Sequence, residues 1–184
     1  TRTPMGASVV QGMGFPFPQE QLDRYSETGL PPQGIGADMI AAEYGITRED
    51  LDAFGALSQQ RAATARDEGR FDNEIIPIEV EIDGQTETMK ADEGIREGTT
   101  AETLAKLKPA FKEDGVITAG NSSQISDGAS AVLIMSKEKA EELGMKPRAR
   151  FHAFAVTGAD PVTMLKGPIP ATKKILEKTG MSID

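Results

Sequence analysis

The densest group of residues able to bind a ligand in this chain is a loop of small polar side chains, at the start of TAGNSSQISDGASAVLIMS (118–136). Gly120 lets a ligand approach the backbone closely, and Asn121, Ser122 and Ser123 supply hydrogen-bonding groups. The same residues are typical of a connection whose side chains bond to their own backbone. Spacing alone leaves both interpretations open.

A second candidate is a group of basic residues in an otherwise acidic segment: Arg96, Lys106, Lys108 and Lys112. A planar guanidinium can stack on a purine, and ammonium groups can face phosphates. Acidic residues are interleaved with them, however, at Glu93, Glu97 and Glu102. That mixture is typical of a solvated surface, which spacing alone favours.

The residues most used in catalysis are scarce. The chain has no cysteine, which excludes disulfides, thiolate metal sites and cysteine catalysis within these residues. Its one histidine, His152, lies in an alternating segment and needs a nearby nucleophile or carboxylate to act, so a structural role is favoured. Acidic pairs such as Glu49 and Asp50 lack further ligands at a suitable spacing. We expect no catalytic residue and no metal site here.

Length and charge narrow the class of protein. A chain of 184 residues corresponds to about one domain and can bury a core. The net charge of −9 argues against nucleic acid as a partner. No apolar run reaches the roughly 18 residues of a membrane span, and residues 1–10 lack a signal-peptide core. We expect a soluble, cytoplasmic protein.

The elements that must position these residues follow from periodicity and capping signals. We expect an irregular segment over 1–33, helices over 34–45, 47–69, 99–107, 137–144 and 169–179, a hairpin over 75–89, and strands over 128–135 and 149–157. Thr47 with Asp50, and Thr99 with Glu102, resemble capping boxes, and Asp83-Gly84 is a strong hairpin turn signal.

Helical spacing also predicts which side chains of the longest helix are buried. The expected core stripe is Leu51, Phe54, Leu57, Ala62 and Ala65. Residues 128–135 are expected to be a buried strand. Residues 118–184 then alternate loop, strand, helix, strand and helix, which indicates an α/β fold.

Four blocks of the sequence closely resemble the thiolase family, which comprises acetyl-CoA acetyltransferases and 3-ketoacyl-CoA thiolases. They read YGITREDLDAFGALSQQRAATARDEGRFDNEIIPIEV, LAKLKPAF, TAGNSSQISDGASAVLIMS and GADPVTMLKGPIPATKKIL, in the family's order. The resemblance implies a thiolase-like α/β fold. Residues 1–117 resemble the loop domain, 118–146 the end of the N-terminal half of the layered core, and 147–184 the start of its C-terminal half.

The resemblance implies an acyltransferase that condenses or thiolytically cleaves 3-ketoacyl-CoA, as in fatty acid metabolism and β-oxidation. The family's nucleophilic Cys lies N-terminal to this region, and its Asn-Glu-Ala-Phe motif, catalytic His and second Cys lie C-terminal to it. We therefore expect both ends of this chain to be internal to a longer protein, with no catalytic residue in this segment, which should be inactive alone.

This middle region supplies the coenzyme A (CoA) site in the family. By resemblance, the candidate binding residues are Arg96, Thr103, Ala110, Phe111, Ala119, Gly120, Ser123, Ile125 and Met164. Arg96 matches the arginine that packs on the adenine, Ser123 matches a serine that bonds the pantetheine arm, and Ile125 and Met164 match positions near the thioester. CoA and acyl-CoA are substrates here, and no permanently bound cofactor is expected.

Two positions depart from the family pattern. Short-chain biosynthetic thiolases carry His-Met before a Gly-Thr-Thr-Ala-Glu stretch, whereas the matching residues here run from Pro32 to Asp38 as PQGIGAD. The resemblance therefore carries no short-chain specificity. The glycine that follows the pantetheine serine is here Gln124, a larger side chain that can alter the loop.

Expected partners are CoA thioesters and further copies of the protein in a homodimer or homotetramer. Two other functions are compatible with the sequence. One is a non-catalytic fragment that binds CoA or acyl-CoA, and the other is an oligomerisation module.

Overall fold

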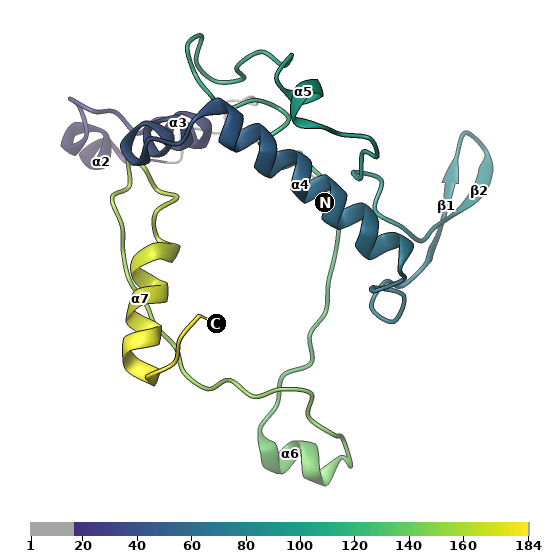
Figure 1. The fold of residues 1–184 in the computed structure, drawn as a ribbon. Coiled ribbons are helices and arrows are strands. Elements are labelled where there is room, and N and C mark those ends of the chain that lie inside the picture. Colours follow the sequence, from purple (N-terminus) through teal and green to yellow (C-terminus); the bar gives the residue numbers. More distant parts are fainter. Residues whose placement is uncertain (1–16, 184) are drawn as a thin grey trace. The chain divides into compact units, whose positions relative to one another are not determined.

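A computed structural model describes residues 17–183, which fall into two compact units (Figure 1). By their place in the sequence, we call residues 37–126 the central unit and residues 17–36 with 127–183 the outer unit. The elements are α2 (Gln19–Arg24), α3 (Gln33–Tyr44), α4 (Arg48–Asp67), β1 (Ile78–Ile82), β2 (Gln85–Met89), α5 (Ala101–Leu104), α6 (Lys137–Glu142) and α7 (Pro168–Thr179). Part of the segment expected to be irregular, residues 1–16, lies outside the described residues; the rest includes the short helix α2.

Helix α4 is the longest element, and its start is fixed by a capping box that confirms the sequence prediction. The Thr47 side chain accepts a hydrogen bond from the Asp50 N–H, and the Asp50 carboxylate accepts one from the Thr47 N–H at 3.0 Å. These bonds satisfy backbone donors that an α-helix leaves unpaired in its first turn. The Thr47 hydroxyl also donates to Asp50 Oδ2 at 2.8 Å.

The predicted core stripe of α4 is wrong at Phe54 and Leu57, while Leu51, Ala62 and Ala65 are partly buried. Phe54 is 69% exposed and Leu57 is 39% exposed, whereas the buried residues of this helix are Asp52, Gly55 and Ala56. Helix α4 packs on α5, and the face it buries carries small and polar residues. The remaining buried apolar side chains of the central unit are Ala41, Leu104 and Ile117, so its core is thin.

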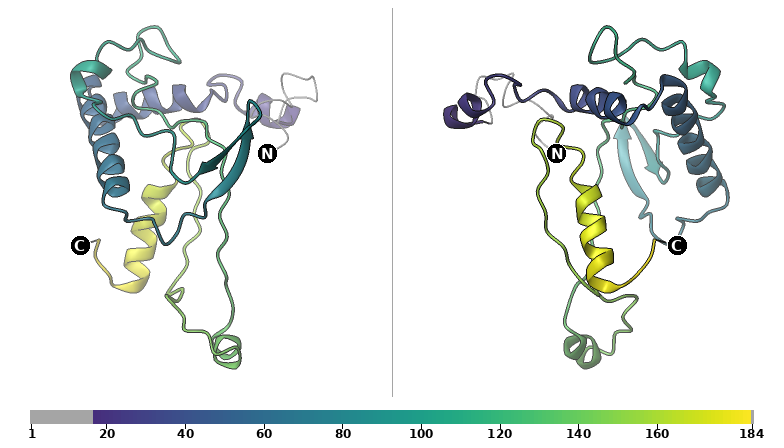
Figure 2. Two further views of the ribbon diagram at one scale, coloured as in Figure 1. Left: turned by 90° about the vertical axis from the view of Figure 1, so that its right-hand side faces the viewer. Right: turned by 60° about the vertical axis from the view of Figure 1, so that its left-hand side comes forward.

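The hairpin confirms the sequence prediction, including its turn. Strands β1 and β2 pair antiparallel from Ile78 opposite Met89 to Ile82 opposite Gln85. Asp83 and Gly84 both have positive φ, 50° and 79°, as a two-residue turn matched to the strand twist requires. Figure 2 shows the hairpin as a separate ribbon reached from the carboxyl end of α4.

Helix α5 is shorter than the predicted helix over 99–107 and has a different cap. Its N-cap is Thr100, which forms a box with Thr103, in place of the expected Thr99 and Glu102. The Thr99 hydroxyl instead donates to the Arg96 carbonyl at 2.7 Å. Two threonines in succession offer two possible caps, and this local bond engages Thr99, one residue before the N-cap Thr100.

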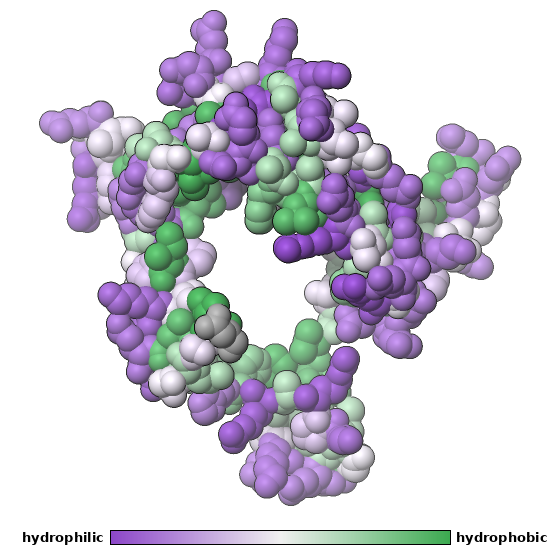
Figure 3. Space-filling view, viewed as in Figure 1, coloured by the Kyte–Doolittle hydropathy of each residue, from purple (hydrophilic) through white to green (hydrophobic). Residues whose placement is uncertain are grey.

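The strands expected over 128–135 and 149–157 are not formed. Both segments run without a hydrogen-bonded partner strand in the described part of the chain (Figure 1). A strand is defined by its ladder to a neighbour, and without one the expected burial also fails, since Val132 is 81% exposed. Hydrophobic residues accordingly show at the surface among hydrophilic ones in Figure 3.

Two of the capping signals in the outer unit are confirmed, at the start of α6 and at the end of α7. Helix α6 ends at Glu142, two residues before the predicted end at 144. Ser136 caps α6 by accepting from the Lys139 N–H, and Gly180 ends α7 with φ of 68°. Lys174 and Lys178 of α7 donate to the carbonyls of Val156 and Phe154 at 2.7 and 3.1 Å. The lysines thus pair backbone acceptors that a neighbouring strand would otherwise occupy. The division of the chain at 117 and 146 stays a prediction.

Replacing the α4 cap should destabilise the protein. Thr47→Ala removes the hydroxyl that accepts the Asp50 N–H, and loss of such a cap costs about 1 kcal/mol. Urea unfolding followed by circular dichroism measures the change. Thr64→Ala, at an exposed position on the same helix, is the matched control and should not destabilise. Equal losses in both variants would show that the cap contributes nothing.

The same cap should make stability depend on pH in the acid range. Hydrogen bonds from the backbone N–H and hydroxyl of Thr47 lower the pKa of Asp50 below its ordinary value of 3.8. A lowered pKa means that ionised Asp50 stabilises the fold above pH 3.8 and that this stabilisation is lost as the pH falls through the folded-state pKa.

We therefore expect Asp50→Asn to unfold at a lower temperature than the wild type at pH 7. The difference should narrow as the pH is lowered below 3.8, which thermal unfolding at a series of pH values measures. A difference that stays constant down to pH 2 would contradict this assignment.

Candidate functional site

The loop singled out in the sequence is held in one conformation by its own asparagine. Asn121 Oδ1 accepts the Thr118 N–H at 2.8 Å, and Asn121 Nδ2 donates to the Val116 carbonyl at 3.1 Å. The Thr118 side chain, which is fully buried, accepts the Gly120 N–H at 3.1 Å. We call residues 116–121 the anchored loop. The interpretation in which Asn bonds its own backbone is correct for Asn121.

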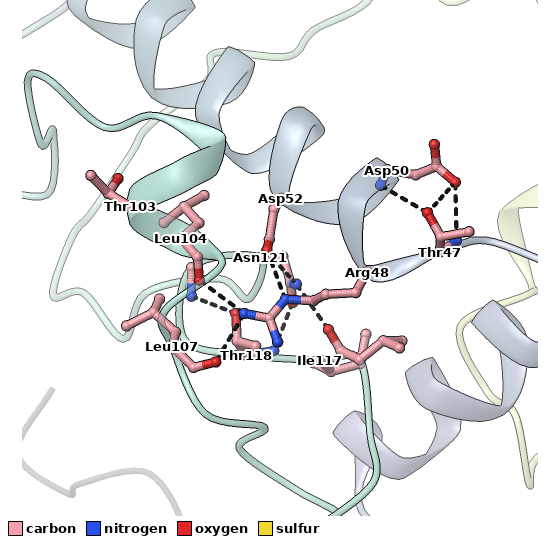
Figure 4. A network of polar contacts seen from close by, with 12 residues as sticks. Thr47, Arg48, Asp50, Asp52, Thr103, Leu104, Leu107, Ile117, Thr118 and Asn121 are labelled. Atoms are coloured by element: carbon pink, nitrogen blue, oxygen red, sulfur yellow. Dashed lines mark hydrogen bonds and ion pairs between the residues drawn. The ribbon is translucent and has the colours of Figure 1, made fainter.

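A buried carboxylate of α4 connects the anchored loop to α5 (Figure 4). Asp52 is 2% exposed; its Oδ2 accepts from Arg48 Nε at 2.7 Å, and its Oδ1 accepts from Asn121 Nδ2 at 3.4 Å. Arg48 Nη2 donates to the carbonyls of Leu104 and Leu107 at 2.8 and 2.9 Å. Arg48 therefore satisfies acceptors at the carboxyl end of α5, where helix carbonyls lack internal partners.

A second carboxylate, from α3, holds the start of the anchored loop. Asp38 Oδ1 accepts the N–H groups of Val116 and Ile117 at 2.7 and 3.2 Å. Its other oxygen is buried without a hydrogen-bond partner among the described residues. A side chain at Gly115 would place its Cβ 2.7 Å from that oxygen, so the turn needs glycine at this position.

Gly120 is required by close packing within the protein. A Cβ at Gly55 of α4 would lie 2.6 Å from the Gly120 carbonyl oxygen. A Cβ at Gly120 would lie 2.6 Å from Leu104 Cδ2 and 2.9 Å from Leu107 Cδ1. The anchored loop thus touches α4 backbone to backbone and contacts the leucines at and just beyond the end of α5. This explains why both positions are glycine.

Arg96 lies beside a shallow groove of about 250 Å³ in the central unit. The groove is lined by Gln59, Gln60, Ala63, Thr64, Asp67, Arg96, Glu97, Gly98 and Thr99. The Arg96 N–H donates to Gln59 Oε1 at 2.8 Å, which fixes its backbone to α4, while the residue itself is exposed. Asp67 and Glu97 both pair with Arg66, so the acidic groups at the groove are partly neutralised.

Gln124 links the Arg96 segment to the residues that follow the anchored loop. Its Nε2 donates to the Gly94 carbonyl at 2.6 Å. Gly94 lies two residues before Arg96, and Gln124 lies directly after Ser123. The residue that departs from the family pattern therefore joins the two segments expected to contact CoA.

The structure places eight of the nine predicted binding residues in the central unit; Met164 belongs to the outer unit. Arg96, Ala119, Ser123 and Ile125 are exposed, and Gly120 is partly buried. The Ala110 N–H donates to the Ile117 carbonyl at 2.8 Å, so Ala110 and Phe111 lie beside the anchored loop. The Thr103 hydroxyl is engaged in capping α5.

Two charged groups near the site have surface partners. Lys112 forms an ion pair with Asp114 at 3.1 Å, and this contact lowers the pKa of the Asp114 carboxyl. A hydrogen bond from Thr100 lowers the pKa of Glu102. In residues 17–183, no cluster of three or more histidine or carboxylate side chains is arranged to hold a metal ion. No described helix is both long and apolar enough to cross a membrane.

Comparison with known proteins identifies the family. The family model for the N-terminal domain of thiolase matches residues 19–138. An acetyl-CoA acetyltransferase of Allochromatium vinosum is 55% identical over 148 residues, covering 80% of this chain and 38% of that protein. A 3-ketoacyl-CoA thiolase of Marinobacter nauticus is 48% identical over 163 residues, covering 88% of this chain and 42% of that protein.

Solved structures agree. The Bacillus anthracis acetyl-CoA acetyltransferase matches with a TM-score of 0.79 and 41% identity, over 83% of this chain and 39% of that chain. Human mitochondrial 3-ketoacyl-CoA thiolase matches with a TM-score of 0.77 and 41% identity, over 83% of this chain and 40% of that chain. The chain therefore belongs to the thiolase family and has a thiolase-like fold. It spans about two fifths of the length of the curated relatives it matches.

The residues that sequence reasoning missed are Asp38, Arg48 and Asp52. All three are polar residues in or beside predicted helices, and all three hold the anchored loop or α5. One signal was present: Arg48 and Asp52 are spaced i, i+4, as an ion pair on one helix face. Their burial depends on segments about 50 or more residues away, which no local pattern reveals.

The close approach at Gly55 predicts that Gly→Ala destabilises the protein at this position, the opposite of its usual effect in a helix. In an open helix, Gly→Ala stabilises by up to about 1 kcal/mol. At Gly55 the new methyl meets the Gly120 carbonyl oxygen, and overpacking of this kind costs about 1–3 kcal/mol. We expect Gly55→Ala to lower the free energy of unfolding, measured by urea titration. Gly128→Ala, where a Cβ meets nothing within 4 Å, is the control. A stabilised Gly55→Ala variant would contradict the packing.

Proposed function

We propose that this chain is the coenzyme-binding part of a thiolase-type acyltransferase acting on CoA thioesters. Relatives named acetyl-CoA acetyltransferase and 3-ketoacyl-CoA thiolase support the reaction class. The observation that carries the proposal is the hydrogen bond between Gln124 and Gly94. It ties the segment bearing Arg96 to the segment bearing Ser123, so that a guanidinium and small polar groups can act on one ligand.

The proposed pose follows from the chemistry of the two segments. The adenine lies against the Arg96 guanidinium at the groove along α4, where a planar cation suits a purine. The thin pantetheine arm passes over Ala119, Gly120 and Ser123, whose small side chains leave the backbone accessible. Ala110 and Phe111 flank the arm, Thr103 lies in the nucleotide region, and Ile125 borders the thioester end.

In the complete protein, the proposed reaction transfers the acyl group of an acyl-CoA to a cysteine sulfur, with CoA as the leaving group. The acetyl-CoA enolate then attacks this thioester and releases the cysteine thiolate; thiolysis by CoA is the reverse. The present chain contains no cysteine, so its proposed contribution is to bind and orient CoA, a proximity effect. Homodimer or homotetramer assembly, cytoplasmic location and a role in β-oxidation remain proposals for that protein.

The proposal predicts that Arg96→Ala weakens binding of the nucleotide part of CoA. Isothermal titration calorimetry should show an affinity lower by about three- to fivefold for both CoA and adenosine 3′,5′-bisphosphate, as loss of one exposed cation–π contact implies. Arg61→Ala, which removes an exposed arginine of α4 outside the groove, is the matched control. Unchanged affinity in Arg96→Ala rejects the adenine contact. Self-association without CoA binding by the wild type would instead favour an assembly module.

A further inference from the structure

The anchored loop depends on a carboxylate that the ligand itself cannot touch. Asp52 is 2% exposed and faces two donors, Arg48 Nε and Asn121 Nδ2. A buried carboxylate must be paired and hydrogen-bonded, because an unpaired buried charge is strongly destabilising. Asp52 therefore constrains the orientation of both donor side chains.

The constraint on Asn121 extends into the backbone of the loop. Its Nδ2 lies between two acceptors, Asp52 Oδ1 and the Val116 carbonyl, and its Oδ1 meets one donor, the Thr118 N–H. If the amide were rotated by 180°, its oxygen would face two acceptors, Asp52 Oδ1 and the Val116 carbonyl, and its NH2 group would face the Thr118 N–H donor. Only one amide orientation satisfies all three contacts, and in it the loop backbone from Val116 to Asn121 is closed.

The constraint on Arg48 extends to residues that pack against the loop from α5. Arg48 bonds the carbonyls of Leu104 and Leu107, and the side chains of these leucines lie against Gly120. One carboxylate thus controls the loop from two sides, through Asn121 directly and through Arg48 by way of α5 (Figure 4).

We propose that Asp52 is a positioning residue for the pantetheine arm: through Asn121 and Arg48 it fixes the backbone at Ala119 and Gly120 in the conformation that receives the arm. This inference rests on the proposed function, because it takes CoA as the ligand. Asp52 makes no contact with the ligand in this proposal. Its effect should therefore fall on the pantetheine part of CoA and leave the nucleotide part unaffected.

The test compares two ligands that share the adenosine 3′,5′-bisphosphate part and differ by the pantetheine arm and the phosphate that joins it. Asp52→Asn in the full 184-residue chain keeps the side-chain shape but replaces one of the two acceptor oxygens by an NH2 group. One of the two donors, Arg48 Nε or Asn121 Nδ2, then loses its acceptor. Calorimetry should show an affinity for CoA lower by about tenfold, the size expected for losing one charge-assisted hydrogen bond, and an unchanged affinity for adenosine 3′,5′-bisphosphate. Glu49→Gln, an exposed charge removal on the same helix turn, should change neither.

A second variant keeps the inference testable if Asp52→Asn does not fold. Asn121→Ala leaves the pair between Arg48 and Asp52 in place. It removes the tie from Asp52 to the loop together with the bonds of Asn121 to Thr118 and Val116. It should reproduce the selective loss of CoA affinity. Hydrogen exchange followed by mass spectrometry should be faster at residues 116–121 in this variant and unchanged in α6, which belongs to the other unit.

The outcomes distinguish failure of the proposed function from failure of the role proposed for Asp52. Equal weakening for both ligands, or weakening for neither, would make Asp52 a purely structural residue and overturn the positioning role. Absence of CoA binding by the wild type would overturn the proposed function and this inference with it. The third outcome is that the wild type binds CoA and that Asn121→Ala binds it equally well although hydrogen exchange in the loop is faster. This outcome would keep the proposed function and reject the inference.

Discussion

The backbone contact between α4 and the anchored loop, at Gly55 and Gly120, is the constraint on which the central unit depends. Because a Cβ at Gly55 would lie 2.6 Å from the Gly120 carbonyl oxygen, neither segment can carry a large side chain there. The contact therefore cannot be stabilised by burying bulky apolar groups. Hydrogen bonds and one ion pair around Asp52 hold the contact instead. A polar network therefore takes the structural role that apolar side chains have in most cores.

Holding the contact by a buried polar network limits its net stability but fixes its geometry. A buried carboxylate contributes little net stability even when well paired, because its desolvation offsets the attraction. Hydrogen bonds are directional, however, and those of Arg48 end on particular carbonyls, Leu104 and Leu107. Apolar packing would allow the loop to slide, whereas this network fixes its register against α5. A fixed backbone position of this kind favours the proposed binding of a narrow ligand.

The sequence predicts those parts of the fold that rest on local chemistry. The box at Thr47, the Asp83-Gly84 turn and the Ser136 cap each need only neighbours within a few residues, and all are present. The prediction of the buried face of α4 fails because periodicity detects apolar stripes. The face that is buried packs against the anchored loop, where Gly120 lies 65 residues from Gly55. The strands at 128–135 and 149–157 fail for a related reason, since a ladder needs a partner that no local signal supplies.

The composition of the loop itself is best understood residue by residue. Gly120 and Asn121 serve the scaffold: one permits the close approach and the other closes the loop on Val116 and Thr118. Ala119 and Ser123 are exposed on either side of them. The two interpretations of the sequence are therefore compatible, because the residues that bond the backbone differ from those that remain accessible. A loop whose central residues are bonded to the scaffold presents its flanking residues in a fixed position, and such preorganisation favours the proposed binding of a thin, flexible arm.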